Sequence, residues 1–313
     1  MKTFSVFLAI LAISIGSLYA QNISDFDLQV HDDGTVTIMN YKGAGGEITI
    51  PEHIFNMPVT KIRGGTWRND WEDPNGAFSG KRLTSVTILA KLTVIEDYTF
   101  YGNQITSVTL PDTLEIIKTG AFYKNHLTSV TLPSNIDIIE GSAFRENRLE
   151  SITIPSKVAW IAASAFHNNA LTSVIIPDNV IYIGNHAFSR NRLTNVVIGN
   201  GVSVIGSNAF YAGDYQGEGN AIAEITLGNS IKHIGDYAFQ THRASAIVIP
   251  DSVVFIGNRA FRSNNDSSTA ITIGSYVVMS DTFDKNFDTA YRNNRRTAGR
   301  YSFTNDDWIF ISN

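Results

Sequence analysis

The sequence predicts a repeat solenoid that is mainly β, a right-handed and curved coil of about ten 22-residue repeats with a β cap at each end. Two observations support this fold class. Ten phenylalanines recur at intervals of 22 residues, except for one interval of 29. Each repeat also carries a short alternating segment that ends at or near a proline or glycine. A fixed period of this length is typical of stacked supersecondary units. The phenylalanines are Phe78, Phe100, Phe122, Phe144, Phe166, Phe188, Phe210, Phe239, Phe261 and Phe283.

One repeat illustrates the expected unit. Residues Leu127–Pro133 alternate apolar and polar side chains from Val130 onward, which predicts a short strand, and the proline ends it because it has no N–H to donate. Ile136 and Ile139 are expected to point inward, and Phe144 to fill the centre of the coil. A 22-residue unit cannot bury these side chains alone, so stacking of neighbouring coils must form a continuous core.

An asparagine lies three residues after each of five consecutive phenylalanines, which predicts a structural ladder. A buried asparagine at a turn can satisfy backbone groups of its own coil and of the adjacent one. A polar binding row is the alternative, but the constant phase favours the ladder. Gly213 and His242 are expected to replace the asparagine in two later coils. The ladder residues are Asn103, Asn125, Asn147, Asn169 and Asn191.

The repeat motif, Leu-Thr-Ser-Val-Thr-Leu-Pro followed by Ile, Gly and Ala-Phe, closely resembles the BspA-type (treponemal-type) leucine-rich repeat. The best matches are Leu127–Phe144, Leu171–Phe188 and Ile222–Phe239. Residues 32–51 resemble that family's entry cap, residues 291–308 resemble its C-terminal hairpin, and the resemblance extends from about residue 26 to the end. It implies a leucine-rich-repeat solenoid and a secreted or surface-exposed adhesin or ligand binder. The family often has cysteine where this chain has asparagine, and it offers no catalytic residues to transfer.

The N-terminus has the features of a secretory signal. Lys2 supplies a positive charge, an apolar run covers Phe4–Ile15, and a small residue, Ala20, precedes the expected mature start at Gln21. An uncleaved membrane anchor is the alternative, but the run is shorter than the ~20 residues that a spanning helix needs. We therefore expect a signal peptide at 1–20, a β cap with a first partial repeat at 21–62, repeats at 63–288 and a cap hairpin at 289–313, with no membrane span after cleavage.

Charge and cysteine content narrow the possible functions. The formal net charge is −5 and the only basic cluster lies near the C-terminus, so no basic face indicates nucleic-acid binding. The chain has no cysteine. It therefore cannot be an acylated lipoprotein, form disulfides or bind zinc through thiolates. Neither a metal nor another cofactor is expected.

The strand residues between the inward positions are expected to line the concave face of the solenoid. Most are serine and threonine, which are also ordinary exposed strand residues. The change to Ile175, Val197 and Val248, with Glu224 and Thr226 beside them, instead suggests an apolar interface. We consider these five residues candidate binding residues.

Two insertions interrupt the repeat, at 64–76 and 211–220. The first carries Trp67 and Trp71 and is expected to cap the open core. The second lies in the middle of the solenoid, where no cap is required, so its residues Tyr211, Asp214 and Tyr215 are further binding candidates.

No nucleophile elbow, phosphate loop or metalloprotease motif occurs in a fitting context, so the chain is not expected to be an enzyme. The predicted function is a monomeric, secreted or cell-surface binding or adhesion module with a protein or glycan partner. A structural or assembly component of the cell envelope is the alternative, and a hydrolase with an unrecognised site is a third possibility.

Overall fold

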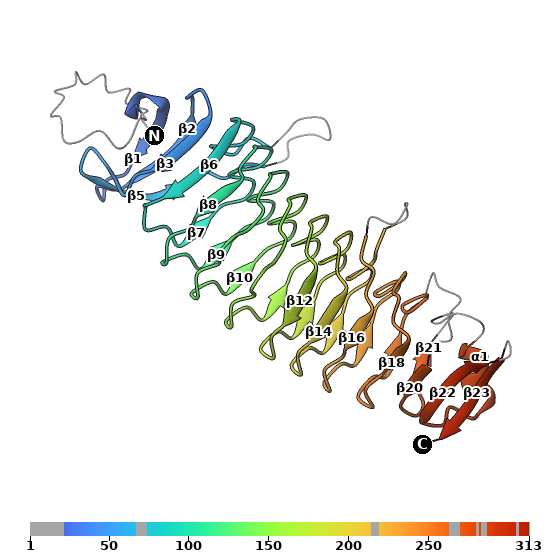
Figure 1. The fold of residues 1–313 in the computed structure, drawn as a ribbon. Helices are drawn as coiled ribbons and strands as arrows, with labels where there is room; N and C mark the ends of the chain where they lie inside the picture. The colour runs from blue at the N-terminus through green and yellow to red at the C-terminus, as the bar shows by residue number, and fades with distance from the viewer. Residues whose placement is uncertain are drawn as a thin grey trace.

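The computed structural model describes residues 22–66, 74–213, 219–262, 270–279, 282, 287–304 and 307–312. The predicted signal peptide, Trp67, Trp71 and Phe283 lie outside these residues. The chain forms an elongated stack of parallel coils that runs from an N-terminal sheet to a C-terminal hairpin (Figure 1). This arrangement confirms the predicted β-solenoid of about ten 22-residue turns. No helix among the described residues is long and apolar enough to cross a membrane.

The N-terminal end is a four-stranded sheet in the order β1-β2-β5-β4. β1 pairs antiparallel with β2, β2 pairs parallel with β5, and β4 and β5 form a hairpin. β3, which lies between β2 and β4 in the sequence, instead forms a ladder with β6 (Leu83–Ile88) and β8 (Ser107–Thr109) of the first coils. The bounds are η1 (Ile23–Asp25), β1 (Phe26–Val30), β2 (Val36–Tyr41), β3 (Gly46–Ile50), β4 (His53–Ile54) and β5 (Met57–Ile62).

A parallel sheet of nine two-residue strands follows the length of the solenoid, with one strand from each coil. We call it the long sheet. Each strand places its second residue in the core and its first residue outward, as in Ile138 and Ile139. The strands are β7 (Val94–Ile95), β9 (Ile116–Ile117), β10 (Ile138–Ile139), β11 (Trp160–Ile161), β13 (Tyr182–Ile183), β15 (Val204–Ile205), β17 (His233–Ile234), β19 (Phe255–Ile256) and β21 (Val278–Met279).

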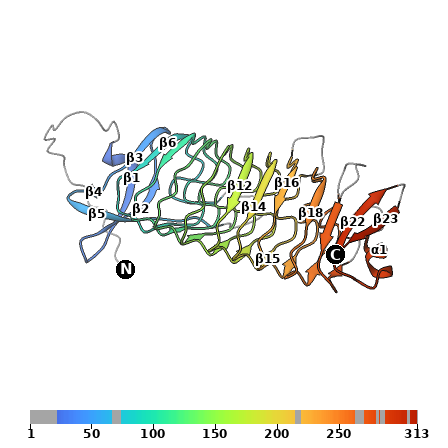
Figure 2. The same cartoon turned by 60° about the horizontal axis from the view of Figure 1, so that its bottom comes forward.

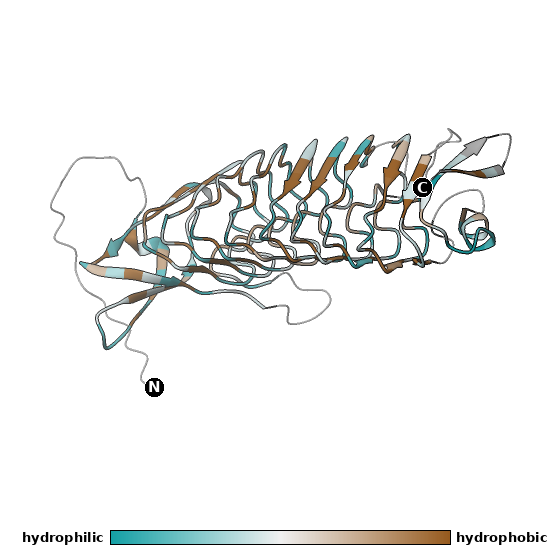
Figure 3. Ribbon diagram, turned by 90° about the horizontal axis from the view of Figure 1, so that it is seen from below, coloured by the Kyte–Doolittle hydropathy of each residue, from teal (hydrophilic) through white to brown (hydrophobic). Residues whose placement is uncertain are grey.

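The alternating segments identified in the sequence form a second, interrupted set of ladders. These are β3-β6-β8, β12-β14-β16 and β18-β20-β22-β23. Figure 2 shows β14 and β15 on different sides of the coil. In Figure 3, hydrophobic stretches alternate with hydrophilic ones along the coils. The bounds are β6 (Leu83–Ile88), β8 (Ser107–Thr109), β12 (Ser173–Ile176), β14 (Asn195–Ile198), β16 (Glu224–Thr226), β18 (Ala246–Val248) and β20 (Ala270–Ile273).

The strand expected within Leu127–Pro133 is absent, and so is its counterpart in the following coil. The side chains of Val130 and Ile152 are only partly buried, whereas the equivalent Val174 and Val196 are fully buried in β12 and β14. Alternation alone therefore does not produce a strand. Depth of burial does not account for the difference, because Val108 and Ile225 are also only partly buried and yet lie in strands.

The predicted phenylalanine spine fills the centre of the solenoid. Among the described residues, nine landmark phenylalanines have at most 1% of their surface exposed. Neighbouring rings stack with centroid distances between 4.9 and 5.7 Å and interplanar angles between 2° and 21°. Full burial of each such ring stabilises the fold by roughly 1.5–3 kcal/mol, and ring stacking adds to this.

The C-terminal end is closed by a helix and a hairpin. The helix α1 (Phe287–Asn293) was not expected from the sequence, and β22 (Gly299–Thr304) and β23 (Asp307–Ser312) pair antiparallel beside β20. Phe287, Tyr291 and Tyr301 are buried against one another. The Tyr291 hydroxyl donates to the Gly274 carbonyl at 2.6 Å, which ties α1 to the coil before it.

Candidate binding faces

The asparagine column lies in the core and links successive coils. Nδ2 of Asn125 donates to the carbonyls of Phe100 (2.8 Å) and Phe122 (3.2 Å), while its Oδ1 accepts from the Ile105 amide at 3.2 Å. The other four ladder asparagines repeat this pattern, and all five are at most 8% exposed. These side chains therefore satisfy backbone groups and do not form a binding row.

The expectation that Gly213 replaces the asparagine was wrong. Asn220 occupies the place, donating to the carbonyls of Phe188 and Phe210 and accepting from the Leu193 amide. The insertion lies between Phe210 and this asparagine, so the ladder resumes after it. In the next coil His242 takes over. Its Nδ1 accepts from the Ala244 amide and its Nε2 donates to the Phe261 carbonyl, an arrangement that requires a neutral ring. Burial lowers the pKa of His242.

Five of the predicted binding residues lie on four strands of the interrupted ladders. Ile175, Val197 and Thr226 are direct neighbours across β12, β14 and β16. Val248 is in the following coil, on β18, and Glu224 accepts from the Asn195 amide group at 2.6 Å in the adjacent row. Ile175 is 69% and Val248 62% exposed, whereas Val197 is half-buried. We call this surface the strand face.

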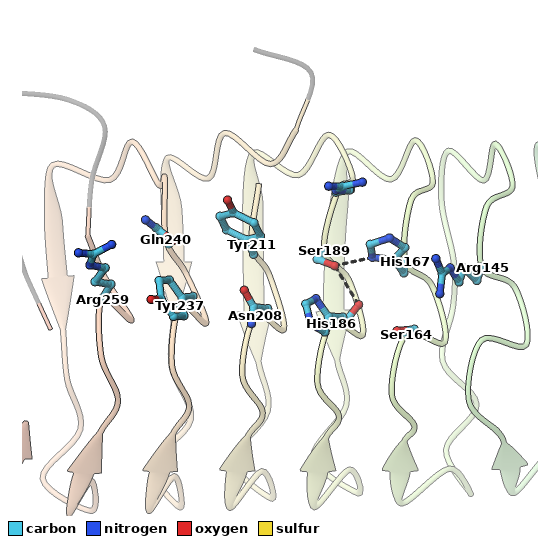
Figure 4. A pocket seen from close by; sticks show the side chains of 11 residues that line it. Arg145, Ser164, His167, His186, Ser189, Asn208, Tyr211, Tyr237, Gln240 and Arg259 are labelled. Atoms are coloured by element: carbon cyan, nitrogen blue, oxygen red, sulfur yellow. Dashed lines mark hydrogen bonds between the residues drawn. The ribbon is translucent and has the colours of Figure 1, made fainter. Parts of the chain in front are cut away.

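Of the predicted loop residues, the structure describes Tyr211, which does not join the strand face. Tyr211 directly follows Phe210 and lines a groove on another side of the coil (Figure 4). Asp214 and Tyr215 lie outside the described residues.

The long sheet carries an apolar column that the sequence analysis missed. Its members are the outward residues of the two-residue strands, which are paired in register. Trp160 is 65% exposed, and its ring lies 5.7 Å from that of Tyr182. The sequence signal was a pair of adjacent apolar residues six and five places before most of the phenylalanines, of which the core needs only one. The column comprises Val94, Ile116, Ile138, Trp160, Tyr182, Val204, His233, Phe255 and Val278.

A polar groove of about 630 Å³ was also missed. It lies on the turns around the Ala-Phe pairs, between the coil of Phe144 and that of Phe261. Its lining comes from two positions in each coil, two residues before and one residue after the phenylalanine, together with Arg190. Because these positions are far apart in sequence and vary in residue type, no single motif indicates the groove.

Two histidines belong to the groove lining. Burial, followed by the positive charges of Arg145 and Arg190, lowers the pKa of His167 from 6.5 to about 4. The same causes lower the pKa of His186. The Nδ1 of His167 lies 2.6 Å from the Ser189 hydroxyl (Figure 4). Ser189 is fully buried and donates to the His186 carbonyl, so this pair positions the turn and does not present a nucleophile to a substrate.

The described residues contain no group of three or more side chains suited to holding a metal ion. The fold provides three extended surfaces, which are the strand face, the apolar column and the groove. Surfaces of this kind can bind a large partner at equilibrium.

Stacked parallel coils around a phenylalanine spine define a leucine-rich-repeat solenoid. The family model described as BspA type leucine rich repeat region matches residues 74–191 and 212–306 in 6 copies. The chain belongs to this family, which confirms the resemblance drawn from its motifs. A search of curated proteins gave no significant match.

Several solved structures are similar to this chain. A leucine-rich repeat protein from Eubacterium ventriosum is 20% identical with a TM-score of 0.42, and the match covers 82% of this chain and 71% of that one. A leucine rich cell surface protein from Faecalibacterium prausnitzii is 19% identical with a TM-score of 0.42, covering 90% and 98%. The pneumococcal vaccine antigen PcpA is 17% identical with a TM-score of 0.45, covering 87% of each chain.

Proposed function

We propose that this protein is a secreted or cell-surface module that binds a protein or glycan partner and serves in adhesion. Its N-terminal sequence supports export with cleavage after Ala20. Recognition takes place at equilibrium and involves no chemical step.

The observation that carries this proposal is the apolar column. Trp160, Phe255 and Val278 face outward and are 65%, 40% and 51% exposed, so much of their apolar surface remains in contact with water. Contiguous exposed apolar residues mark interaction surfaces, and large aromatic side chains dominate the binding energy of interfaces. The column follows the whole long sheet, which suits a broad macromolecular surface.

The strand face is a second contact region of the same module. Ile175 and Val248 are exposed aliphatic residues, and Val197, Glu224 and Thr226 lie among them. The 211–220 loop, with Tyr211, Asp214 and Tyr215, is the third contact region proposed from the sequence. Tyrosines bury a large area at low entropic cost.

The test is capture of partners from host and bacterial surface extracts by residues 21–313, followed by affinity measurement on the captured partner. Trp160→Ser should weaken binding by more than ~1 kcal/mol while thermal stability is retained. Phe55→Ser is the matched control, because Phe55 is 64% exposed in the N-terminal hairpin and belongs to neither face.

For the strand face, Val197→Asp should weaken binding to a similar degree. Thr131→Asp places the same charge on an earlier coil, where the equivalent positions all carry threonine, and should have little effect. Wild-type affinity in both Trp160→Ser and Val197→Asp would exclude these faces. Concentration-dependent oligomers, with no partner captured, would favour an assembly component of the envelope instead.

A further inference from the structure

The groove exists because some of the coils that line it carry small side chains. Ser164, Ser189 and Asn208 stand at its centre. In earlier coils the same two columns carry Tyr98, Tyr101 and Tyr123, and ring contacts join Tyr101 to both of the others. The groove lining begins at Arg145, one coil after the last of these tyrosines.

The groove backbone is held rigidly. Ser164, His186 and Asn208 all have φ of 58°, in the left-handed region. Each of their amides donates to a carbonyl of the next coil, at 2.8 to 3.0 Å. Residues other than glycine adopt this conformation at a cost of about 1–2 kcal/mol, so the surrounding ladder must impose it. A surface fixed in this way loses little entropy on binding.

The charge of the groove is opposite to that of the chain. Among the described residues, three arginines and no carboxylate line it, whereas the whole chain has a net charge of −5. Arg145 is anchored by Glu146 at 3.2 Å and lies over the Tyr123 ring. No ion pair involving Arg190 is present in the described part of the chain. Guanidinium groups bind carboxylate, sulfate and phosphate oxygens in a bidentate manner.

The remaining lining favours a sugar polymer over an acidic peptide. Asn208 and Gln240 can both donate and accept hydrogen bonds, as sugar hydroxyls require. Tyr211 and Tyr237 present rings with a polar edge. In the part of the groove that the structure describes, no lining residue is aliphatic, so this part offers no apolar pocket for peptide side chains. From the coil of Arg145 to that of Arg259 there are five coil steps, on the order of 24 Å, which suits an extended oligosaccharide.

We propose that this groove binds an extended acidic glycan. Arg190 pairs with its carboxylate or sulfate groups, Asn208 and Gln240 donate to and accept from its hydroxyls, and Tyr237 packs against a sugar ring. None of the groove residues belongs to the apolar column or the strand face, and the site takes one defined ligand class, so it goes beyond the proposed function.

The experiment measures calorimetric binding of residues 21–313 to four octamers: a heparin-derived oligosaccharide, oligogalacturonate, neutral maltooctaose and octaglutamate. The sulfated glycan, the carboxylated glycan, or both should bind. Comparison of the heparin-derived oligosaccharide with oligogalacturonate identifies which anion the groove recognises. Maltooctaose and octaglutamate should bind at least on the order of tenfold more weakly. No binding of either acidic glycan, or equal binding of octaglutamate, would overturn the proposal.

Two variants locate the site. Arg190→Gln should weaken glycan binding about tenfold, while Arg192→Gln, an exposed arginine of the same coil outside the groove lining, should change it less than twofold. Ser164→Tyr fills the hollow without changing charge, and the backbone accepts it because Tyr98 and Tyr237 stand in the same column with φ of 50° and 58°. It should weaken binding as Arg190→Gln does.

Equal losses in Arg190→Gln and Arg192→Gln, or wild-type affinity in Ser164→Tyr, would refute the assignment. Thermal melting of each variant establishes that it is folded. Because Trp160→Ser leaves the groove intact, failure of glycan binding and failure of partner capture are separate results.

Discussion

Replacing Asn147 with alanine removes one rung of the asparagine ladder, and the structure sets the size of the effect. Its Nδ2 donates to the carbonyls of Phe122 (2.8 Å) and Phe144 (3.2 Å), and its Oδ1 accepts from the Leu127 amide at 3.1 Å. The two carbonyls keep a second donor, Asn125 and Asn169 respectively. The buried Leu127 amide keeps none, so the variant leaves one orphaned N–H and should lose roughly 1–3 kcal/mol.

The assay is equilibrium urea unfolding of residues 21–313, with Asn135→Ala as the control. Asn135 is an exposed asparagine that donates to the Asp112 carbonyl at 2.9 Å, and its loss should cost less than about 0.5 kcal/mol. Asn147→Asp should be worse than alanine at neutral pH, because a buried carboxylate would face the Phe122 carbonyl. A free energy of unfolding unchanged in Asn147→Ala would refute the reasoning.

Three further predictions follow from the same structure. Phe166→Ala should lower the free energy of unfolding by about 3–5 kcal/mol, because the ring stacks on Phe144 and Phe188. A loss below about 1 kcal/mol in urea unfolding would show that the phenylalanine spine is not tightly packed. The folded pKa of His167, about 4, lies below the unfolded value of 6.5, so its contribution is complete above pH 6.5 and is lost as pH falls towards 4. This contribution to the free energy of unfolding amounts to about 1–2 kcal/mol after solvent screening. In His167→Gln, the urea midpoint should therefore depend less on pH between 7.5 and 4 than in the wild type. Intact-mass analysis of the exported protein should give a chain that starts at Gln21, and retention of Met1 would contradict export by cleavage.

Much of the fold could be predicted from the sequence, because the signals repeat at a constant phase. Phe144 and Asn147 each belong to a column that the 22-residue interval reveals directly. Asn220 could not be placed, since the insertion moves it from three to ten residues after its phenylalanine. Only the hydrogen bonds to Phe188 and Leu193 identify it as a rung.

The binding faces were harder to predict, because they depend on which neighbour a side chain meets in the next coil. Ile138 and Ile139 look equivalent in the sequence, yet one is 42% exposed and the other 2%. The groove depends on the small side chain of Ser164. A serine at this position does not indicate a groove until it is compared with the tyrosines that other coils carry at the same position.

The most direct test of the central claim is oxidative footprinting of the complex with a captured partner. If the module binds through the sides of its solenoid, then Trp160, Tyr182 and Phe255 should be protected in the complex relative to the free protein. Protection confined to the terminal regions, at Phe55 and the β22–β23 hairpin, with these three side chains as reactive as in the free protein, would contradict the account and indicate end-to-end assembly.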